Sequence, residues 1–248
     1  MNQGIYEVLS NKWIAPDTYE MVLYGDTRSL ASQSRPGQFL NIKLEGLYLR
    51  RPISVCNVYG NEITIIYKIV GKGTLKLSMM LEGQMLDVLC GLGNGFDIEA
   101  AKGHNIAVIG GGVGVPPMYG VARALREQGQ PVTAILGFQT MEAAFYIDKF
   151  RELGCKVLVT TDDGTLGLKG FVTDALRTTS CDYYLACGPQ PMLKSLHKTG
   201  LPGQMSFEER MGCGFGACMG CTCHTLVGMK RICKDGPVFK SEEVTFGE

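Results

Sequence analysis

A run of cysteines near the C-terminus constrains this 248-residue chain more than any other feature of its sequence. Cys213, Cys218 and Cys221 follow the spacing C-x4-C-x2-C, and eleven residues separate the last of them from Cys233. This is the ligand spacing of plant-type [2Fe–2S] proteins. Two irons need four thiolates that converge on a compact object, so the chain must wrap tightly around them. The run therefore predicts a [2Fe–2S] cluster held by these four thiolates.

Glycines within the run suit such a loop. Gly214, Gly216 and Gly220 permit sharp backbone turns and leave amide N–H groups free to bond the sulfurs. Structural zinc is a competing interpretation, but zinc sites favour paired C-x2-C knuckles, and this run holds one. In a third interpretation no metal binds, and the glycine-rich segment then has little reason to fold. The spacing favours the iron–sulfur cluster over both.

Two residues beside the run could complicate the ligand set. Cys223 lies two residues past the third ligand and could replace it, although a small buried residue in a strand at Thr222–Val227 is its more ordinary role. His224 could replace a thiolate as in Rieske centres, but those need two histidines. His104 and His197 lie in no matching pattern. A solvated His224 is expected.

Overall composition argues against several classes of partner. Lys and Arg together number 24, as do Asp and Glu, so the formal charge of zero gives no support for nucleic acid or an anionic membrane as a partner. The first residues have neither a basic nor an apolar region, and no apolar run approaches the ~20 residues of a membrane helix. We therefore expect a cytoplasmic protein whose ten cysteines are reduced thiols.

The first part of the chain, residues 1–99, has short β-type segments punctuated by Gly, Pro and Asn. The candidate strands are Ile5–Ile14, Tyr19–Tyr24, Gln38–Leu44, Ile53–Tyr59, Glu62–Val70 and Met85–Leu89. Asn61 after Gly60 has the composition of a hairpin turn, and one short helix is expected near Thr74–Leu81. About six strands at this spacing predict a small antiparallel β-barrel.

Residues 100–202 instead alternate between strands and helices. The expected strands are Asn105–Ile109, Val132–Leu136, Lys156–Thr160 and Tyr183–Ala186, and the expected helices are Val115–Gln128, Met141–Leu153, Phe171–Arg177 and Gln190–Thr199. This alternation predicts a Rossmann-like α/β domain, with a parallel sheet covered on both faces. Residues 203–248 are too few for a core of their own, so a cluster is the candidate staple for a small third domain.

A short motif in the barrel region points to a flavin. Arg51-Pro52-Ile53-Ser54 opens one of the strands, and a barrel with Arg-Pro-x-Ser ahead of a βαβ domain resembles the ferredoxin-reductase superfamily. The resemblance implies that Arg51 meets the FAD pyrophosphate and that Ser54 lies near flavin N5. Many members carry a tyrosine where Ile53 stands, so only apolar contact with the ring is expected there. A surface pair with a carboxylate is the alternative for Arg51.

A second motif, Tyr67–Thr74, is a strand that runs into a glycine turn and a short helix. Backbone N–H groups at a helix N-terminus favour a phosphate. The motif is not a Walker A loop, because Lys72 is followed by glycine rather than by Ser or Thr. The superfamily resemblance implies that FAD is lined by Ile66, Tyr67, Lys68, Gly73 and Thr74. In the alternative, Thr74 is merely an N-cap.

A third motif follows the first strand of the α/β region. It reads G-x-G-x-x-P at Gly112, Gly114 and Pro117, rather than the Rossmann G-x-G-x-x-G. No acidic residue ends the next strand to anchor a ribose. The superfamily has this form, which implies that the diphosphate of NAD(P) lies near the glycines. No Arg or Lys within Gly137–Thr140 could meet a 2′-phosphate, so NAD is expected rather than NADP.

Cys187-Gly188-Pro189 follows the last expected parallel strand. The superfamily has a similar motif beside the nicotinamide, which implies a catalytic position for Cys187. A small core residue before a helix-starting proline is an equally open interpretation.

The order of these parts, over the whole chain, resembles the electron-transfer subunits of class 1B dihydroorotate dehydrogenases. The likeness is strongest at Cys213–Cys221, Cys233–Phe239, Thr161–Gly164 and Gly170–Val172. It implies a heterotetramer with an FMN-containing catalytic subunit that oxidises dihydroorotate in pyrimidine (UMP) biosynthesis. This chain would pass the electrons to NAD⁺ and would not oxidise dihydroorotate alone. FAD belongs between cluster and nucleotide, because a flavin exchanges one electron or two.

Two other functions remain open at this point. The same chemistry could serve another complex, such as a bifurcating transhydrogenase or a sulfite-reductase-type assembly. A zinc-stapled interaction module without catalytic activity is the third interpretation.

Overall fold

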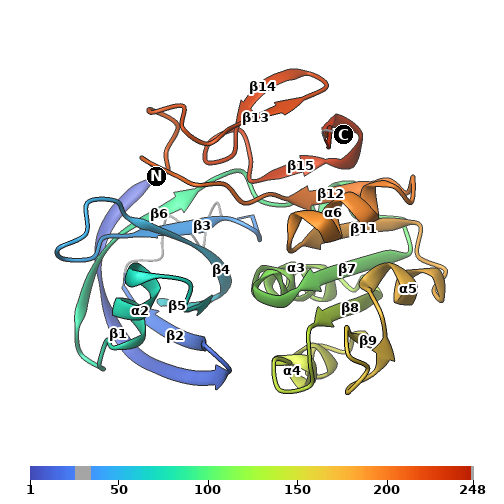
Figure 1. Cartoon of the computed structure of the whole chain (residues 1–248), viewed down its shortest axis with the longest axis horizontal. Helices are drawn as coiled ribbons and strands as arrows, with labels where there is room; N and C mark the ends of the chain where they lie inside the picture. Colours follow the sequence, from blue (N-terminus) through green and yellow to red (C-terminus); the bar gives the residue numbers. More distant parts are fainter. Residues whose placement is uncertain (26–34, 247–248) are drawn as a thin grey trace.

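The computed structural model describes residues 1–25 and 35–246, and its first part is a closed antiparallel barrel. The strands are β1 (Asn2–Ala15), β2 (Thr18–Tyr24), β3 (Phe39–Ile42), β4 (Arg51–Tyr59), β5 (Glu62–Lys68) and β6 (Met85–Leu92). They close in the order β1-β2-β5-β4-β3-β6, on the left of Figure 1. The predicted six-stranded barrel is confirmed. Strand β1 begins earlier than predicted because Asn2–Gly4 pair with the last part of β6.

Side chains alternate across the barrel wall, as expected for strands with one solvated face. In β5, Ile63, Ile65 and Tyr67 are buried in the barrel interior, where Leu23 of β2 joins them. Helix α2 (Lys72–Ser78) contributes Leu77 to the same core. The helix begins two residues before its predicted start and ends three residues before its predicted end.

The second part of the chain is a sheet of seven strands in the order β10-β9-β8-β7-β11-β12-β15, on the right of Figure 1. Its strands are β7 (Ile106–Gly111), β8 (Val132–Phe138), β9 (Lys156–Thr161), β10 (Leu168–Lys169), β11 (Tyr183–Cys187), β12 (Gly203–Ser206) and β15 (Val238–Lys240). All neighbours pair in parallel except β12 and β15. The predicted Rossmann-like sheet is confirmed.

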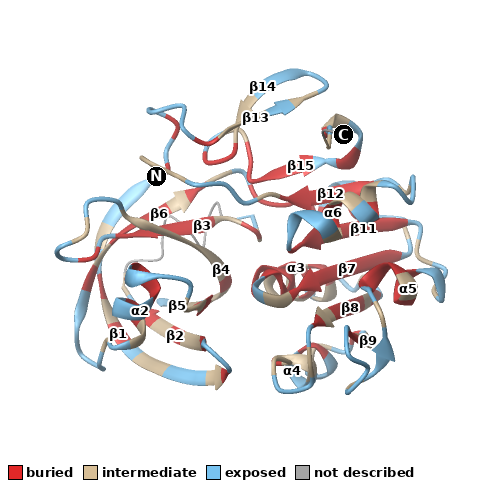
Figure 2. Cartoon of the chain, viewed as in Figure 1, coloured by how far each residue is buried: buried red, intermediate tan, exposed pale blue. Residues whose placement is uncertain are grey.

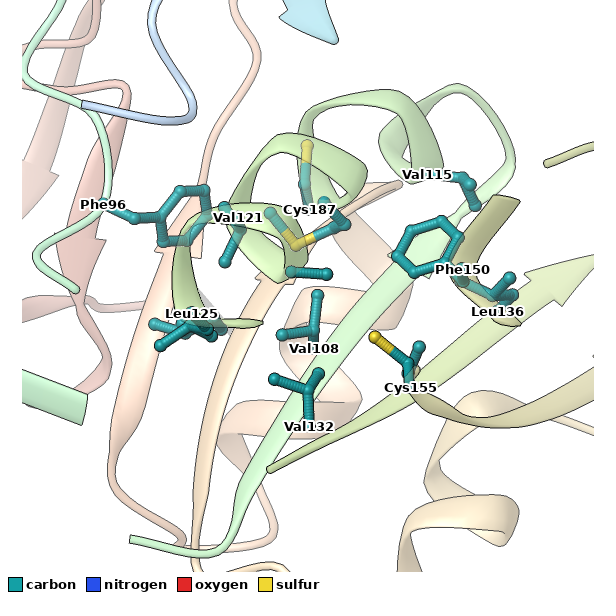
Figure 3. Packing of buried hydrophobic residues seen from close by; sticks show 14 of the residues in the cluster. Phe96, Val108, Val115, Val121, Leu125, Val132, Leu136, Phe150, Cys155 and Cys187 are labelled. Carbon is teal, nitrogen blue, oxygen red and sulfur yellow. The ribbon is translucent and has the colours of Figure 1, made fainter. Parts of the chain in front are cut away.

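Helices cover both faces of this sheet. They are α3 (Val115–Glu127), α4 (Ile147–Glu152), α5 (Val172–Arg177) and α6 (Gln190–His197), with short 3-10 turns η1 (Glu99–Ala101), η2 (Gly112–Gly114) and η3 (Ser241–Glu243). Val108 of β7 packs beneath Val121 and Leu125 of α3 (Figure 3). The next residue, Ile109, packs on the opposite face with Leu193 of α6.

Helix α4 is much shorter than the predicted Met141–Leu153. Tyr146 precedes it with a φ of 66° and carries its ring away from the helical path. The ring makes an edge contact with Tyr119, and its hydroxyl donates a hydrogen bond of 2.5 Å to Oε2 of Glu20 in the barrel. Contacts with the barrel therefore replace the first turns of the predicted helix.

The C-terminal segment lies across the top of both parts in Figure 1. It begins with β12, continues through the cysteine run and a hairpin of β13 (Thr222–Thr225) and β14 (Gly228–Arg231), and ends after β15. The expected strand Thr222–Val227 is shortened because the chain turns at residues 226–227. The short strands β12 and β15 join the seven-stranded sheet, so this segment shares its core. The division into residues 1–99, 100–202 and 203–248 stays a prediction.

Barrel and sheet meet where α3 lies against β4. A Cβ added to Gly120 of α3 would stand 2.7 Å from the Cys56 carbonyl oxygen, so the two backbones are in close contact. Nη1 of Arg123 also donates hydrogen bonds to Oδ1 of Asn57 (2.6 Å) and the carbonyl of Val58 (3.1 Å). Figure 2 shows buried residues continuing from the barrel strands into β7, β11 and β12. These contacts hold the two parts in one orientation.

Within the described residues, no helix combines the length and the apolar character needed to cross a membrane.

Candidate functional site

A cavity of about 850 Å³ opens along the barrel where it faces the seven-stranded sheet. All nine residues that the sequence predicts for FAD line it: Arg51, Pro52, Ile53, Ser54, Ile66, Tyr67, Lys68, Gly73 and Thr74. They come from the start of β4, the end of β5 and the start of α2. The fold thus brings two separate motifs into one cavity of the size that a large cofactor needs.

Arg51 lies across the start of α2, in the cavity wall. A Cβ added to Gly73 would collide with its guanidinium Nε, and its Nη1 donates to the carbonyl of Leu49. The neighbouring Arg50, not Arg51, forms an ion pair with a carboxylate, because its Nη2 lies 3.0 Å from Oδ1 of Asp87. In the described part of the chain Arg51 has no carboxylate partner, so its charge faces the cavity beside the N–H groups of a helix start.

A second cavity, of about 600 Å³, lies over the carboxyl ends of the parallel strands. Gly112 lines it, together with the ends of β8 and the starts of α5 and α6. Gly114 and Pro117 do not. A Cβ at Gly114 would collide with the carbonyl oxygen of Cys187, so this glycine lets the start of α3 approach the loop after β11. Pro117 is buried in the first turn of α3.

The two cavities adjoin, because Lys68, Val113 and Glu208 line both of them. Glu208 follows β12 and keeps part of its surface open to the cavities, yet the protein around it is dense enough that burial raises the pKa of its carboxyl. A ligand in one cavity would therefore touch a ligand in the other at this junction.

Cys187 lies at the end of β11 and lines the first cavity. It is buried, and burial raises the pKa of its thiol to about 12. A raised pKa favours the neutral thiol, which suits a small packing group in the cavity wall. The catalytic position of Cys187 stays a prediction.

Asp162 lines the second cavity and is a candidate residue that no motif of the sequence indicated. It follows β9 and lines the second cavity with Gln139 and Thr140, which follow β8. The sequence search for a ribose anchor covered the end of β8, whereas the acidic group comes from the neighbouring strand. Thr161–Gly164 stood out within the family resemblance, but only the pairing of β8 with β9 shows that it faces the nucleotide turn.

The predicted cluster ligands come together as two pairs of thiols. Backbone N–H groups of Cys218 and Cys213 each point at the other's sulfur, both at 3.4 Å, and the N–H of Cys233 points at Sγ of Cys221 at 3.4 Å. In the described residues no three His, Cys, Asp or Glu side chains converge as a single ion would require. Two pairs of thiolates are the donor set that two irons need.

The loop around Cys213 is shaped to hold a thiolate. Burial raises the pKa of this thiol, but N–H groups of Phe215, Cys218 and Ala217 outweigh burial and lower the pKa to about 6. Their nitrogens lie 3.5, 3.4 and 3.2 Å from the sulfur. Gly214, with a φ of 78°, makes the turn that directs them. The predicted N–H bonds to sulfur are therefore present, and the residues fit an iron–sulfur cluster.

Cys223 and His224 lie outside this arrangement. Both are on β13, where Cys223 is half-buried and opposite Lys230 of β14, while His224 is exposed and opposite Met229. Burial raises the pKa of the Cys223 thiol. The two side chains are placed as the sequence predicted for a packing residue and a solvated histidine.

Two family models match the chain in the order of its parts. Residues 108–198 match the oxidoreductase NAD-binding domain, and residues 208–245 match the iron-sulfur cluster binding domain of dihydroorotate dehydrogenase B.

Curated relatives are similar over almost the whole chain. The dihydroorotate dehydrogenase B (NAD(+)), electron transfer subunit, of Bacillus pumilus (strain SAFR-032) is 45% identical over 257 residues, which cover 98% of each chain. The protein of the same name from Geobacillus sp. (strain WCH70) is 44% identical over 258 residues, covering 98% of this chain and 99% of the relative.

A solved structure with the same fold comes from an NADH-dependent reduced ferredoxin-NADP oxidoreductase, studied for flavin-based electron bifurcation. It superposes with a TM-score of 0.88 at 34% identity, covering 98% of this chain and 90% of that chain.

Proposed function

Because the chain belongs to the family of dihydroorotate dehydrogenase B (NAD(+)) electron transfer subunits, we propose that it carries electrons from a catalytic partner to NAD⁺ through a [2Fe–2S] cluster and FAD. The observation that carries this proposal is the pair of adjoining cavities, which share Lys68, Val113 and Glu208. A flavin in one and a nicotinamide in the other would meet at that junction.

The barrel cavity is assigned to FAD. A bound flavin exchanges a hydride with NAD and single electrons with an iron–sulfur cluster. Arg51 and the N–H groups at the start of α2 hold the diphosphate, because a free guanidinium and a helix N-terminus both favour a phosphate. Ser54 and Ile53, on the cavity wall of β4, position the ring edge and its face. Cys187 closes the wall toward the second cavity.

The second cavity is assigned to NAD. Gly112 offers its backbone to the diphosphate, while Gly114 and Pro117 shape the turn from beneath. The carboxylate of Asp162 is suited to accept hydrogen bonds from ribose hydroxyls and to repel a 2′-phosphate. This supports NAD rather than NADP.

The cluster is assigned to Cys213, Cys218, Cys221 and Cys233. Cys218 is exposed, whereas Cys221 and Cys233 are buried. One side of the ligand loop therefore faces outward, where a partner can approach.

The partner is proposed to be an FMN-containing subunit that oxidises dihydroorotate, assembled with this chain in a heterotetramer. We place the assembly in the cytoplasm, where ten free cysteines would stay reduced.

A second candidate is service in an electron-bifurcating complex. The likeness to the NADH-dependent reduced ferredoxin-NADP oxidoreductase favours it. The higher identity to the dihydroorotate dehydrogenase subunits, over an equally long match, favours the first candidate.

A reconstitution tests the proposal. The chain alone, loaded with both cofactors, should oxidise NADH with ferricyanide but should not reduce NAD⁺ with dihydroorotate. Adding the FMN-containing catalytic subunit should produce NADH from dihydroorotate and NAD⁺, with orotate formed in equal amount. Dihydroorotate oxidation by the chain alone would refute the subunit assignment, and absence of NADH from the assembled pair would refute the electron route.

A further inference from the structure

Strand β3 separates the barrel interior from the cluster segment. All four of its residues are buried. Leu40 and Ile42 belong to the barrel core, while Phe39 packs in the other core beside Cys221 and Cys233. Because side chains alternate along a strand, Asn41 lies on the same outer face as Phe39. A polar side chain is thus buried between the barrel and the cluster loop, with only 1% of its surface exposed.

Asn41 contacts the first cluster ligand directly. Its Nδ2 donates a hydrogen bond of 3.0 Å to the carbonyl oxygen of Cys213. The contact is tight, because a Cβ on the following Gly214 would collide with the same Nδ2. The other amide atom, Oδ1, is buried and has no hydrogen-bond partner among the described residues. Burying an amide with one unpaired atom costs free energy, so its place here needs an explanation, and the hydrogen bond to Cys213 offers one.

The bond holds the peptide from which the sulfur-directed loop departs. Gly214 follows Cys213 with a φ of 78°, and the N–H groups of Phe215 and Ala217 then return to the Cys213 sulfur. Fixing the carbonyl of Cys213 therefore fixes the direction of these donors. N–H bonds to sulfur stabilise the more negative, reduced form of an iron–sulfur cluster and so raise its reduction potential.

On its other side, Asn41 adjoins the wall of the cavity assigned to FAD. Its register partner across β3 and β4 is Pro52, and the next pair along the same outer face joins Phe39 to Ser54. Phe39, Pro52 and Ser54 all line that cavity. Only the β3–β4 pairing separates the cavity wall from the hydrogen bond to Cys213.

We propose that Asn41 is a positioning residue for the cluster. From the outer face of the barrel, it holds the Cys213 loop in the shape that directs backbone N–H groups at the Cys213 sulfur. It thereby sets the reduction potential of the cluster and its placement beside the flavin. This inference rests on the proposed cluster and FAD sites.

Asn94 provides a matched control. It follows β6 and also ties the barrel to the cluster segment, donating from Nδ2 to the carbonyls of Asp235 (2.9 Å) and Val238 (3.0 Å) and accepting from the N–H of Val238 (3.2 Å). It touches no ligand cysteine among its described hydrogen bonds. Losing its side chain removes a tether of the segment at Asp235 and Val238 but no hydrogen bond to residues 213–218.

The test compares the wild-type chain, Asn41→Leu and Asn94→Leu, each loaded with FAD and iron. An electron paramagnetic resonance titration gives the midpoint potential and spectrum of the reduced cluster, and an optical titration gives the FAD potential. In Asn41→Leu we expect a more negative cluster potential, an altered spectrum and an unchanged FAD potential. In Asn94→Leu, cluster and FAD should match the wild type.

Other results for the two variants would either overturn or support a positioning role for Asn41. A wild-type potential and spectrum in Asn41→Leu would overturn the inference, as would equal shifts in both variants, since Asn41 would then be one tether among several. If Asn41→Leu fails to retain iron, retention in Asn94→Leu supports the inference and loss in both overturns it. A wild-type chain without a reduced-cluster signal would refute the proposed cluster site itself, and this inference with it.

Discussion

Asp162 reaches the nucleotide cavity from β9, whereas a dinucleotide fold ordinarily takes its ribose anchor from the strand after the glycine turn. The neighbouring Asp163 instead makes contacts within its own turn. Oδ1 of Asp163 accepts hydrogen bonds from the N–H (3.0 Å) and hydroxyl (2.7 Å) of Thr165, and these bonds lower the pKa of its carboxyl. Two adjacent carboxylates thus have separate roles, one toward the cavity and one toward its own turn.

Removing the charge at Asp162 should weaken the preference for NADH over NADPH. Asp162→Asn keeps the side-chain shape but no longer repels a 2′-phosphate. We expect kcat/KM for NADPH to rise about tenfold, which corresponds to ~1.4 kcal/mol, with a smaller change for NADH. Steady-state reduction of ferricyanide with each nucleotide measures the ratio. Asp163→Asn is the control, and equal changes in the two variants would contradict a specific role for Asp162.

The residues of the cluster site are easier to predict from the sequence than those of the cavities. The four cysteines proposed as ligands stand out in the sequence because three of them lie within one short run, and the structure brings their thiols into two pairs. The residues proposed for FAD needed a family resemblance to link Arg51 with Gly73, and the fold places both in the wall of one cavity. Asp162 and Asn41 could not be found from the sequence, because their importance depends on which strands and loops become neighbours.

At the scale of elements, the C-terminal segment contains two distinct parts, the cysteine loop (Cys213–Cys221) and the β13–β14 hairpin. The loop carries three of the four predicted ligand thiols, and Cys233, which follows β14, supplies the fourth. Cys223 lies within the hairpin, in a strand pair with its own register, and packs against the core that contains Cys221 and Cys233. Elements with a strong local signal were predicted well, as α3 and the barrel strands show. The short strands β10, β12 and β15 were not, because two to four residues carry no periodicity and pair only when the sheet edge is already present.

Replacing a ligand should empty the loop without disturbing the flavin. Cys218→Ser removes one of the two thiolates of its pair, so we expect iron content to fall to background while FAD stays bound. In the assembled pair, the rate of dihydroorotate-dependent NADH formation should then fall about tenfold or more. Iron analysis and flavin absorbance measure both cofactors. Cys223→Ser should retain iron, and loss of iron from Cys223→Ser alone would reverse the ligand assignment.

At the scale of the molecule, function depends on how barrel and nucleotide sheet are oriented, since the two cavities meet between them. The contact of α3 with β4 at Gly120 sets this orientation, together with the bond between Tyr146 and Glu20. Sequence patterns identified both parts but not their contact, because Gly120 and Cys56 lie far apart in the chain and neither belongs to a motif.

Gly120→Ala tests this contact through the sign of the change in the free energy of unfolding. Alanine inside an exposed helix normally stabilises by up to ~1 kcal/mol relative to glycine. Here its Cβ would stand 2.7 Å from the Cys56 carbonyl oxygen, so we expect destabilisation of about 1–3 kcal/mol and slower flavin reduction by NADH. Chemical denaturation and stopped-flow absorbance measure the two effects. A more stable variant with an unchanged rate would show that the contact is unimportant.

The iron-binding segment is held at both ends by the nucleotide sheet, with β12 before it and β15 after it. Those strands pair through backbone hydrogen bonds that involve no cysteine thiolate, so we expect the segment to fold without bound iron. Iron delivery then becomes a late maturation step on a finished polypeptide. On the proposed assignments, a cell starved of iron is expected to accumulate a flavin-containing chain that NADH reduces but that cannot exchange electrons with its proposed partner.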